Sequence, residues 1–186
     1  MALSDRSAEA NHNMDLSKIK AFAFDIDGVA TDGGILCNTD GDFLRVYDAK
    51  DGFAVRMACM NAYEVAVITG GRSKSIMERF KASGVKAENI YLHSRDKMDD
   101  FGKFCEKYAL QPDEVMYFGD DIPDVELMKA CGIGVCPSDA VPEAKAAADF
   151  ISSRPGGKGC LREGIEMVMR AQGRWLFETS LYKKMF

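Results

Sequence analysis

Short apolar runs alternate with longer amphipathic stretches along most of the chain. The runs that predict buried strands are 21–25, 64–68, 89–92, 114–118, 132–135 and 149–151. The stretches that predict helices are 52–61, 74–83, 97–108, 123–130, 141–147 and 161–172. Strands that alternate with helices form parallel sheets joined by right-handed crossovers. The sequence therefore predicts an α/β fold built on a doubly wound parallel sheet.

One segment, residues 34–48, breaks this alternation. Residues 35–38 and 43–47 flank a polar stretch at 39–42, which predicts a β-hairpin with a four-residue turn. A two-stranded hairpin is marginally stable by itself in water, so its apolar side chains need a partner surface. These side chains are Ile35, Leu36, Phe43, Leu44, Val46 and Tyr47. The hairpin either folds back on its own domain or pairs with another subunit, and we favour the second arrangement.

The length of 186 residues predicts one domain, which we place at residues 16–173. Residues 1–15 are polar and lack the apolar centre of a signal peptide, so we expect a disordered lead-in. Residues 174–186 form a tail with several large apolar side chains. This tail either packs on the domain or lies at an interface.

Composition argues against several classes of function. The apolar content of 47% is normal for a globular protein, and no apolar stretch is long enough to span a bilayer. The net charge is −5 and no long basic block occurs, which argues against nucleic acid or an anionic membrane as a partner. The six cysteines include no C-x-x-C pair, which favours reduced thiols and a cytoplasmic location. Two histidines are too few for a multi-histidine zinc site.

The predicted strand at 21–25 leads into two carboxylates, Asp25 and Asp27, and the chain then turns at Gly28. Residues i and i+2 of a strand point to the same side, so both carboxylates can reach one site above the carboxyl edge of the sheet. Ligands of open α/β sheets bind at this edge. Two adjacent anions repel each other unless a cation lies between them, which favours a Mg²⁺ site. The alternative is an ordinary polar turn, because Asp-Gly is a common turn signal.

Three further polar signals follow other predicted strands. Thr69 starts the sequence Thr-Gly-Gly-Arg-Ser, whose hydroxyl and backbone N–H groups suit a phosphate. Lys97 opens the helix at 97–108, and the segment 119–124 places three carboxylates around a tight turn. Taken one at a time, these signals have plain alternatives: a strand-to-helix turn, a surface lysine and an acidic helix cap. A parallel sheet places the carboxyl ends of its strands at one edge, so together the signals predict one active site.

The order D-x-D-G, T-G, K and G-D-D-x-x-D on successive strands resembles the haloacid dehalogenase superfamily of phosphotransferases, over about residues 20–150. The resemblance implies that Asp25 is the nucleophile, which forms an aspartyl-phosphate, and that Asp27 is the general acid and base. It also implies that Thr69 and Lys97 hold the phosphoryl group. The implied cofactor is Mg²⁺, with Asp25, Asp27 and Asp120 as ligands and Asp121 and Asp124 in support. An acid at position 27 favours a phosphatase over a dehalogenase, which needs no such acid.

The intervals between the motifs leave no room for the cap domain that many of these enzymes carry. A capless chain with a hairpin after the first motif resembles the 3-deoxy-D-manno-octulosonate 8-phosphate (KDO 8-phosphate) phosphatase family. The matching segments are Lys-Asp-Gly-Phe at 50–53 with Arg56, the turn at 70–73, and residues 156–163. The resemblance implies a homotetramer built through the hairpin, a glycine-rich segment that reaches a neighbour's site, and a role in the lipopolysaccharide pathway.

An acidic sugar phosphate fits the cations in these segments, because it carries a carboxylate in addition to its phosphate. We expect Arg72, Lys158 and Arg162 to pair with such a substrate, and Arg162 is equally typical of an ordinary helix face. The full set that we assign to substrate binding is Thr31, Arg56, Gly70, Arg72, Lys158 and Arg162.

Three alternatives stay open. A phosphatase for a nine-carbon keto acid phosphate, related to sialic acid, would share the fold and the catalytic set. A non-catalytic subunit, kept for assembly or as an activator, predicts the loss of Asp25, Asp27 or Lys97, all of which are present. A phosphomutase usually needs a cap to hold its intermediate. We therefore expect a Mg²⁺-dependent phosphatase that hydrolyses KDO 8-phosphate to KDO and phosphate.

Overall fold

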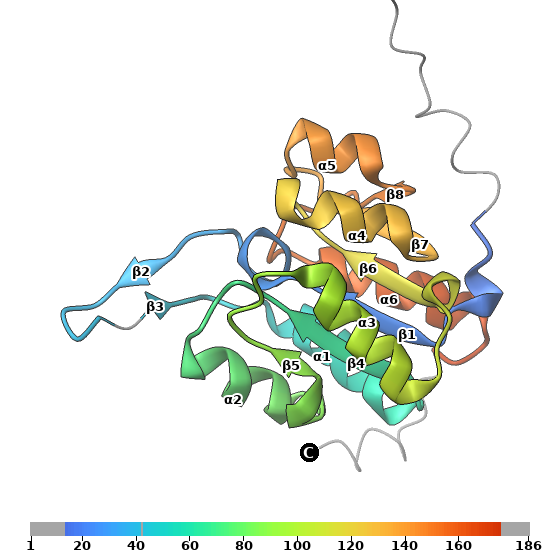
Figure 1. The fold of residues 1–186 in the computed structure, drawn as a ribbon, viewed down its shortest axis with the longest axis horizontal. Helices are drawn as coiled ribbons and strands as arrows, with labels where there is room; N and C mark the ends of the chain where they lie inside the picture. The colour runs from blue at the N-terminus through green and yellow to red at the C-terminus, as the bar shows by residue number, and fades with distance from the viewer. Residues whose placement is uncertain (1–13, 42, 176–186) are drawn as a thin grey trace, which may run out of the picture.

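The computed structural model describes residues 14–41 and 43–175, and it contains a six-stranded parallel sheet (Figure 1). The strands of this sheet are β1 (Ala21–Phe24), β4 (Glu64–Ile68), β5 (Ile90–Tyr91), β6 (Val115–Phe118), β7 (Ile133–Cys136) and β8 (Phe150–Ile151). Their spatial order is β5-β4-β1-β6-β7-β8, with every neighbouring pair parallel. This order confirms the doubly wound sheet that the sequence predicts.

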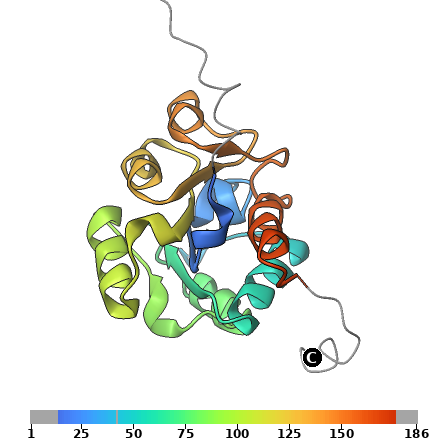
Figure 2. The same ribbon diagram turned by 90° about the vertical axis from the view of Figure 1, so that its right-hand side faces the viewer.

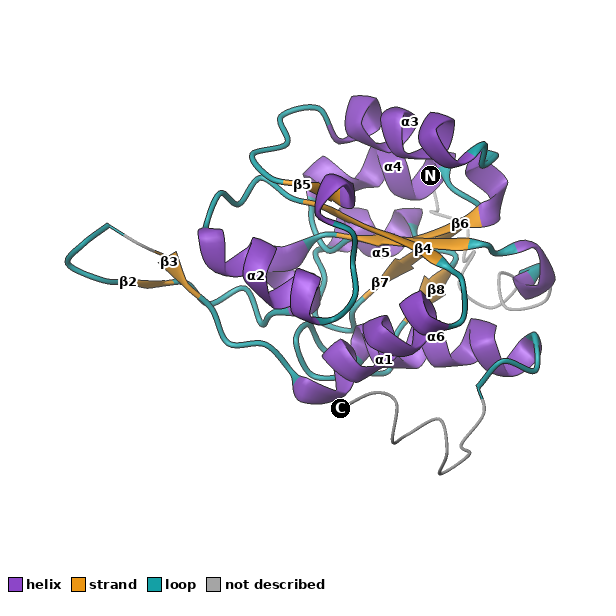
Figure 3. Cartoon of the chain, turned by 90° about the horizontal axis from the view of Figure 1, so that it is seen from below, coloured by secondary structure: helices purple, strands orange, loops and turns teal. Residues whose placement is uncertain are grey.

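Helices cover both faces of the sheet (Figure 2, Figure 3). They are α1 (Ala49–Met60), α2 (Lys74–Ala82), α3 (Lys97–Tyr108), α4 (Val125–Ala130), α5 (Pro142–Ala147) and α6 (Cys160–Ala171). Helices α1, α2 and α6 pack on one face, and α3, α4 and α5 pack on the other. Short helical turns lie at Leu16–Lys18, Ile26–Ala30, Ala87–Asn89, Pro112–Glu114 and Ile122–Asp124.

The central strand β1 is buried on both sides, which explains its unbroken apolar sequence. Phe22 and Phe24 point into the core beneath α1, α2 and α6. Ala21 and Ala23 point into the second core, beneath α3, α4 and α5. Small residues on one side and large residues on the other therefore place β1 firmly between the two helical layers.

Two helices begin two or more residues away from the start that the sequence pattern indicates. Helix α1 begins at Ala49, three residues before the predicted start, because the Asp48 side chain accepts hydrogen bonds from the N–H groups of Lys50 and Asp51. The segment predicted as one helix at 123–130 is a 3₁₀ turn, Ile122–Asp124, followed by α4. Capping side chains determine the start of α1 and, through Asp121, the start of the 3₁₀ turn, whereas α4 itself has no side-chain cap.

The predicted hairpin is present and extends away from the domain (Figure 1, Figure 3). Strands β2 (Leu36–Cys37) and β3 (Phe43–Leu44) are antiparallel, and both are shorter than the predicted runs at 35–38 and 43–47. Leu36 faces Leu44 across the ladder, and Cys37 faces Phe43. At the base of the arm, Tyr47 packs edge-on against Phe80 of α2, with 5.6 Å between the ring centroids. The arm itself leaves several apolar side chains exposed: Ile35, Leu36, Phe43, Leu44 and Val46.

Residues near the two ends of the described part of the chain lie close to each other. Gln172, just after α6, donates hydrogen bonds to the carbonyl groups of Leu16 and Ile19. Trp175 is buried against Phe53 of α1, so the start of the tail packs on the domain. The rest of the predicted lead-in and tail, residues 1–13 and 176–186, lies outside the described residues. Within the described part of the chain, no helix is long and apolar enough to cross a membrane.

Candidate active site

The site lies where the chain reverses its direction of travel across the sheet. From β1 the chain first builds the sheet towards β4 and β5, and then returns to the other side of β1 to form β6. The carboxyl ends of β1 and β6 are therefore neighbours, with loops that leave in different directions. Such a switch point is where open α/β sheets bind ligands. Asp25 follows β1 directly, and the acidic segment 119–124 follows β6.

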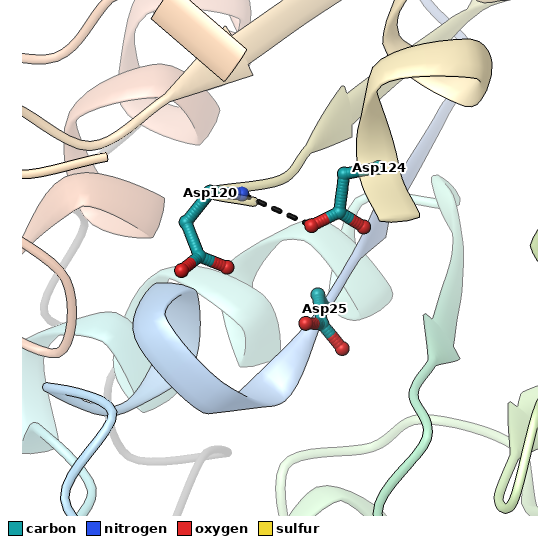
Figure 4. Close-up of side chains that lie close together, drawn as sticks. All are labelled: Asp25, Asp120 and Asp124. Atoms are coloured by element: carbon teal, nitrogen blue, oxygen red, sulfur yellow. Dashed lines mark hydrogen bonds between the residues drawn. The ribbon is translucent and has the colours of Figure 1, made fainter. Parts of the chain in front are cut away.

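Three carboxylates meet at this point (Figure 4). Asp25, Asp120 and Asp124 each offer one oxygen, and these oxygens all lie within 4.8 Å of one another. Asp25 and Asp124 are buried, and Asp120 is partly exposed. Oδ2 of Asp124 accepts a hydrogen bond from the N–H of Asp120 at 3.1 Å, and another from Asp121 at 3.3 Å. Asp124 thus fixes the loop that carries Asp120.

Gly28 lets the two loops of the site approach each other. Its φ is +92°, a left-handed conformation that favours glycine. A Cβ at this position would lie 2.0 Å from Oδ2 of Asp120. The glycine of the D-x-D-G motif is therefore needed for two separate reasons, the backbone turn and the space for the carboxylate.

Lys97 supplies the positive charge at the centre of the site. It is the first residue of α3, and its Nζ lies 2.6 Å from Oδ1 of Asp124 and 3.3 Å from Oδ1 of Asp25. Burial by itself would lower the pKa of Lys97, but the two carboxylates raise it above its ordinary value. Lys97 is thus held as a cation between the carboxylates of Asp25 and Asp124.

The carboxylates carry more negative charge than Lys97 offsets. Burial, together with the charge of Asp124, raises the pKa of Asp25 to about 6 against the opposing effect of Lys97. Burial and the charges of Asp25 and Asp124 raise the pKa of Asp120 to about 7. Oδ1 of Asp25 is buried with Nζ of Lys97 as its charged neighbour, and Oδ1 of Asp120 is buried and accepts no hydrogen bond within the described residues. Carboxylate oxygens gathered in this way are ligands that a hard cation such as Mg²⁺ prefers.

Thr69 closes the site on the side of β4. It is buried at the end of that strand, and its Oγ1 accepts a hydrogen bond from the N–H of Gly71 at 3.1 Å. This contact shapes the turn at 69–71 and leaves the hydroxyl hydrogen able to donate. Gly70 and Arg72 are exposed on the same loop. The structure thus brings together, at one edge, the motif residues that follow β1, β4, β5 and β6.

Asp27 lies on the turn Ile26–Ala30, and its carboxylate binds a side chain that sequence reasoning missed. Nε of Arg45 lies 2.6 Å from Oδ1 of Asp27, and Nη2 of Arg45 lies 2.8 Å from Oδ2. Arg45 comes from the hairpin and follows β3 by one residue. Its only sequence signal is a charge within the apolar pattern of the hairpin, Phe-Leu-Arg-Val-Tyr.

Comparison with known proteins agrees with this geometry. A family model for haloacid dehalogenase-like hydrolases matches residues 66–159. The KDO 8-phosphate phosphatase of Escherichia coli K12 is 33% identical over 156 residues, which cover 84% of this chain and 82% of that enzyme. The chain belongs to the KDO 8-phosphate phosphatase family of haloacid dehalogenase-like hydrolases. It is therefore a phosphatase of this superfamily.

Solved structures of this family share the fold. The KDO 8-phosphate phosphatase from Yersinia pestis has a TM-score of 0.82 and 30% identity, covering 86% of this chain and 85% of that one. The enzyme from Moraxella catarrhalis, solved with a magnesium ion, a phosphate ion and KDO, has a TM-score of 0.84 and 27% identity, covering 91% of this chain and 95% of that one. Each likeness extends over most of both chains.

The glycine-rich segment of this phosphatase lies against a site loop of its own chain. The N–H of Gly157 donates to the carbonyl of Val29 at 2.8 Å, and a Cβ on Gly157 would lie 2.5 Å from the carbonyl carbon of Thr31. Thr31 is fully buried, and its hydroxyl donates to the carbonyl of Ile26. Lys158 reaches the rim, with Nζ 3.9 Å from Oδ2 of Asp32. Thr31 therefore shapes the loop, whereas Lys158 is a half-exposed cation beside Asp32 of the same loop.

The guanidinium groups of Arg56 and Arg162 make contacts outside the carboxylate cluster. Arg162 places Nε 2.5 Å from Oε2 of Glu166, and its guanidinium lies 4.5 Å from the centroid of the Trp175 ring. Arg56 donates to the carbonyl of Ala82, at the end of α2 that points away from the site. Their assignment to substrate binding stays a prediction, and within one chain both residues pack between helices.

Proposed function

We propose that this phosphatase hydrolyses KDO 8-phosphate to KDO and phosphate, through an aspartyl-phosphate on Asp25 and with Mg²⁺ as cofactor. The relatives named above are KDO 8-phosphate phosphatases, and the one from Moraxella catarrhalis holds magnesium, phosphate and KDO. The observation that carries the proposal is the cluster of Asp25, Lys97 and Asp120 at the switch point of the sheet.

The nucleophile is Asp25, which lies where a phosphoryl group would meet the carboxyl edge. Phosphoryl transfer depends mainly on positioning and on neutralisation of charge. Lys97, 3.3 Å from Asp25, can neutralise a phosphoryl oxygen beside the attacking carboxylate. The hydroxyl of Thr69 and the N–H groups of its turn can orient the same group. When bound by Asp25 and Asp120, Mg²⁺ supplies the further positive charge that reduces repulsion between the phosphate and the carboxylates.

Asp27 is the general acid and base in this proposal. In its protonated form it donates a proton to the leaving alkoxide when Asp25 attacks, and it regains a proton from the water that hydrolyses the aspartyl-phosphate. General acid–base catalysis typically contributes about 10²–10⁴-fold to the rate. The side chain of Asp27 is about one-third exposed, at 29%, so it can meet a leaving group that arrives from solvent.

The described part of the chain supplies no cap over the site, so we propose that other copies complete it. In the described part of the interval between Asp27 and Lys97, the chain forms only the hairpin, helices, short turns and sheet strands, and no cap domain. A cavity of about 220 Å³ exists, but its lining residues, such as Glu64 and Lys86, lie at the opposite edge of the sheet. Exclusion of water from phosphoryl transfer then needs a neighbouring subunit. The proposed assembly is a homotetramer built through the hairpin.

The proposed setting follows from the same substrate. KDO 8-phosphate is an acidic sugar phosphate, and we place the reaction in the cytoplasm, in the synthesis of lipopolysaccharide precursors. Neither nucleic acid nor a membrane surface is a proposed partner, in agreement with the net charge of −5.

The proposal is tested by a substrate panel. The full-length protein is incubated with Mg²⁺ and KDO 8-phosphate, a nine-carbon keto acid 9-phosphate, or a neutral hexose 6-phosphate, and phosphate release is measured. We expect the highest kcat/KM with KDO 8-phosphate, loss of activity in excess chelator, and no turnover by Asp25→Asn. Preference for the nine-carbon substrate would replace the proposed substrate but keep the mechanism. Undiminished turnover by Asp25→Asn would overturn the mechanism, and no turnover of any substrate by the wild type would favour a non-catalytic subunit.

A further inference from the structure

Arg45 is a partly buried residue at the foot of an exposed hairpin, and the chain covers its charged side chain. Its side chain is only 2% exposed, although its neighbour Val46 is 75% exposed. All three guanidinium nitrogens donate hydrogen bonds: Nε and Nη2 to the two oxygens of Asp27, and Nη1 to the carbonyl of Phe43 at 3.1 Å. The burial of a charged side chain is unfavourable unless its donors are paired, so this arrangement needs an explanation.

The paired contact between Arg45 and Asp27 fixes the plane of the carboxylate. A guanidinium group that binds both carboxylate oxygens restrains orientation as well as position, which a lysine ammonium does not. Asp27 lies on a short turn next to Gly28 and has the more exposed side chain of the pair. Each oxygen keeps a second lone pair, so the contact leaves the carboxylate able to face a reacting group. Arg45 therefore restricts the motion of Asp27 without blocking it.

Arg45 also joins three parts of the molecule. The carbonyl of Phe43 accepts the hydrogen bond from Nη1 of Arg45. Phe43 belongs to β3 and pairs with Cys37 of β2. On the other side, Nη2 of Arg45 and Oγ1 of Thr69 each lie 3.3 Å from the point where a Cβ on Gly71 would be. The guanidinium group thus lies between the hairpin, the turn that carries Asp27 and the turn proposed to bind phosphate.

We propose that Arg45 is a positioning residue that holds Asp27 in its catalytic orientation and makes that orientation depend on the hairpin. The inference rests on the proposed function, because it gives Asp27 an acid–base role. A hairpin that carried only a docking surface would need no buried charge at its base. Here the same segment that exposes apolar side chains to a further copy also holds a catalytic carboxylate.

The test is a double-mutant cycle with Arg45→Met, Asp27→Asn and the combined variant, assayed with Mg²⁺ and KDO 8-phosphate. Misplacement of a catalytic group lowers rates by up to about 10²-fold, so we expect Arg45→Met to lower kcat by about 10- to 100-fold. KM should stay within about threefold, since Arg45 acts on Asp27 and not on the bound substrate. In the Asp27→Asn background, Arg45→Met should change kcat by less than about twofold, because the group it positions is already absent.

Two further variants make the result specific. Arg45→Lys keeps the charge and loses the paired geometry, so it should retain an intermediate kcat, and it serves as the test if Arg45→Met does not fold. Arg79→Met removes another partly buried arginine near Tyr47, whose guanidinium group donates to Ser83 and to the carbonyl of Asp48 and not to Asp27; it should have the same effect in both backgrounds. The inference is overturned if Arg45→Met lowers kcat equally in both backgrounds, or if it leaves kcat unchanged or raised in the wild-type background.

If the proposed substrate is wrong, the double-mutant cycle gives a different result than if the proposed role of Arg45 is wrong. The cycle is repeated with p-nitrophenyl phosphate, by single-turnover release of inorganic phosphate, because the hydrolytic step also uses Asp27. If the wild type hydrolyses this compound but not KDO 8-phosphate, the substrate assignment is overturned. The role of Arg45 is then judged from the cycle measured with p-nitrophenyl phosphate. If Asp27→Asn keeps wild-type turnover on every substrate tested, Asp27 has no acid–base role and the inference about Arg45 falls with it.

Discussion

The hydroxyl of Tyr117 lies 2.5 Å from Oδ1 of Asp124, the same carboxylate oxygen that holds Nζ of Lys97 at 2.6 Å. Tyr117 is a fully buried residue of β6, and sequence reasoning missed it because the strand otherwise reads as a plain apolar run. The Tyr117 hydroxyl holds Asp124 from the interior of the sheet. Asp124 in turn holds Lys97 and the loop of Asp120. The cluster of charges is therefore anchored to the interior of the sheet.

Tyr117→Phe should lower activity without unfolding the protein. The change removes one hydrogen bond to a charged group, a contact that contributes about 1.5–3 kcal/mol. We expect kcat to fall by about tenfold or more, with weaker binding of Mg²⁺ as the carboxylates lose their orientation. Steady-state kinetics over a range of Mg²⁺ concentrations measures both effects. Tyr108→Phe is the matched control, because its hydroxyl donates to Asn89 near the opposite edge of the sheet, and it should keep wild-type kcat.

The positions of Asp25, Asp120 and Lys97 could be predicted because parallel topology determines them. Residues that follow adjacent parallel strands must meet at one edge, so local patterns were sufficient to bring these side chains together. Arg45 and Asp27 are 18 residues apart, and their contact depends on how the hairpin leaves the sheet. No periodicity in the sequence encodes that direction. The same holds for Arg162, whose place beside Trp175 depends on the packing of α6 against α1.

Removal of Mg²⁺ from the metal site at high pH should destabilise the protein. Burial raises the pKa of Asp25 to about 6 and that of Asp120 to about 7, both from an ordinary value of 3.8. When the pKa of a carboxyl group is higher in the folded than in the unfolded protein, the group stabilises the folded state fully at pH values below the unfolded-state pKa. This contribution is lost as the pH rises through the folded-state pKa. The Mg²⁺-free protein should therefore lose stability between about pH 4 and pH 7, and Mg²⁺ should restore it.

Asp120→Asn tests this origin of the pH dependence. In chelator at pH 8 we expect its Tm to exceed that of the wild type by about 2–6 °C, with a smaller difference at pH 5. Differential scanning calorimetry at the two pH values measures the change. Asp113→Asn, an exposed charge outside the site, should shift Tm by no more than about 2 °C. A lower Tm for Asp120→Asn at pH 8 in chelator would show that repulsion among the carboxylates does not control stability.

The hairpin should hold the oligomer together. Leu36 and Leu44 face each other across the ladder, Cys37 and Phe43 form the next pair, and the apolar members are all exposed on one chain. Side chains of adjacent ladder pairs point to opposite faces, so both faces of the arm are apolar and need cover. Leu36→Glu should yield monomers in light scattering, whereas Leu36→Met should assemble as the wild type does. Assembly of Leu36→Glu would place the interface elsewhere.

Lys158 and Arg162 should differ in effect, although the sequence assigns both to the substrate carboxylate. Lys158 is a half-exposed cation at the rim, beside Asp32, and it lies on the glycine-rich segment that packs against the loop of Thr31. Arg162 is engaged by Glu166 and Trp175, and its N–H donates to the buried Asp51 of α1. Lys158 is therefore placed to meet an anion, whereas Arg162 joins two helices of the same chain.

Substitution of each residue by alanine separates recognition from packing. A lost contact between a cation and a substrate carboxylate is expected to cost about 1.5–3 kcal/mol, or about 10- to 100-fold in kcat/KM. Lys158→Ala should show this loss for KDO 8-phosphate and much less for a neutral sugar phosphate, with Tm nearly unchanged. Arg162→Ala should lower Tm and affect both substrates alike, because a packing defect does not distinguish them. If Lys158→Ala reduces kcat/KM equally for both substrates, Lys158 serves the phosphate or the fold, and carboxylate selection must come from another residue.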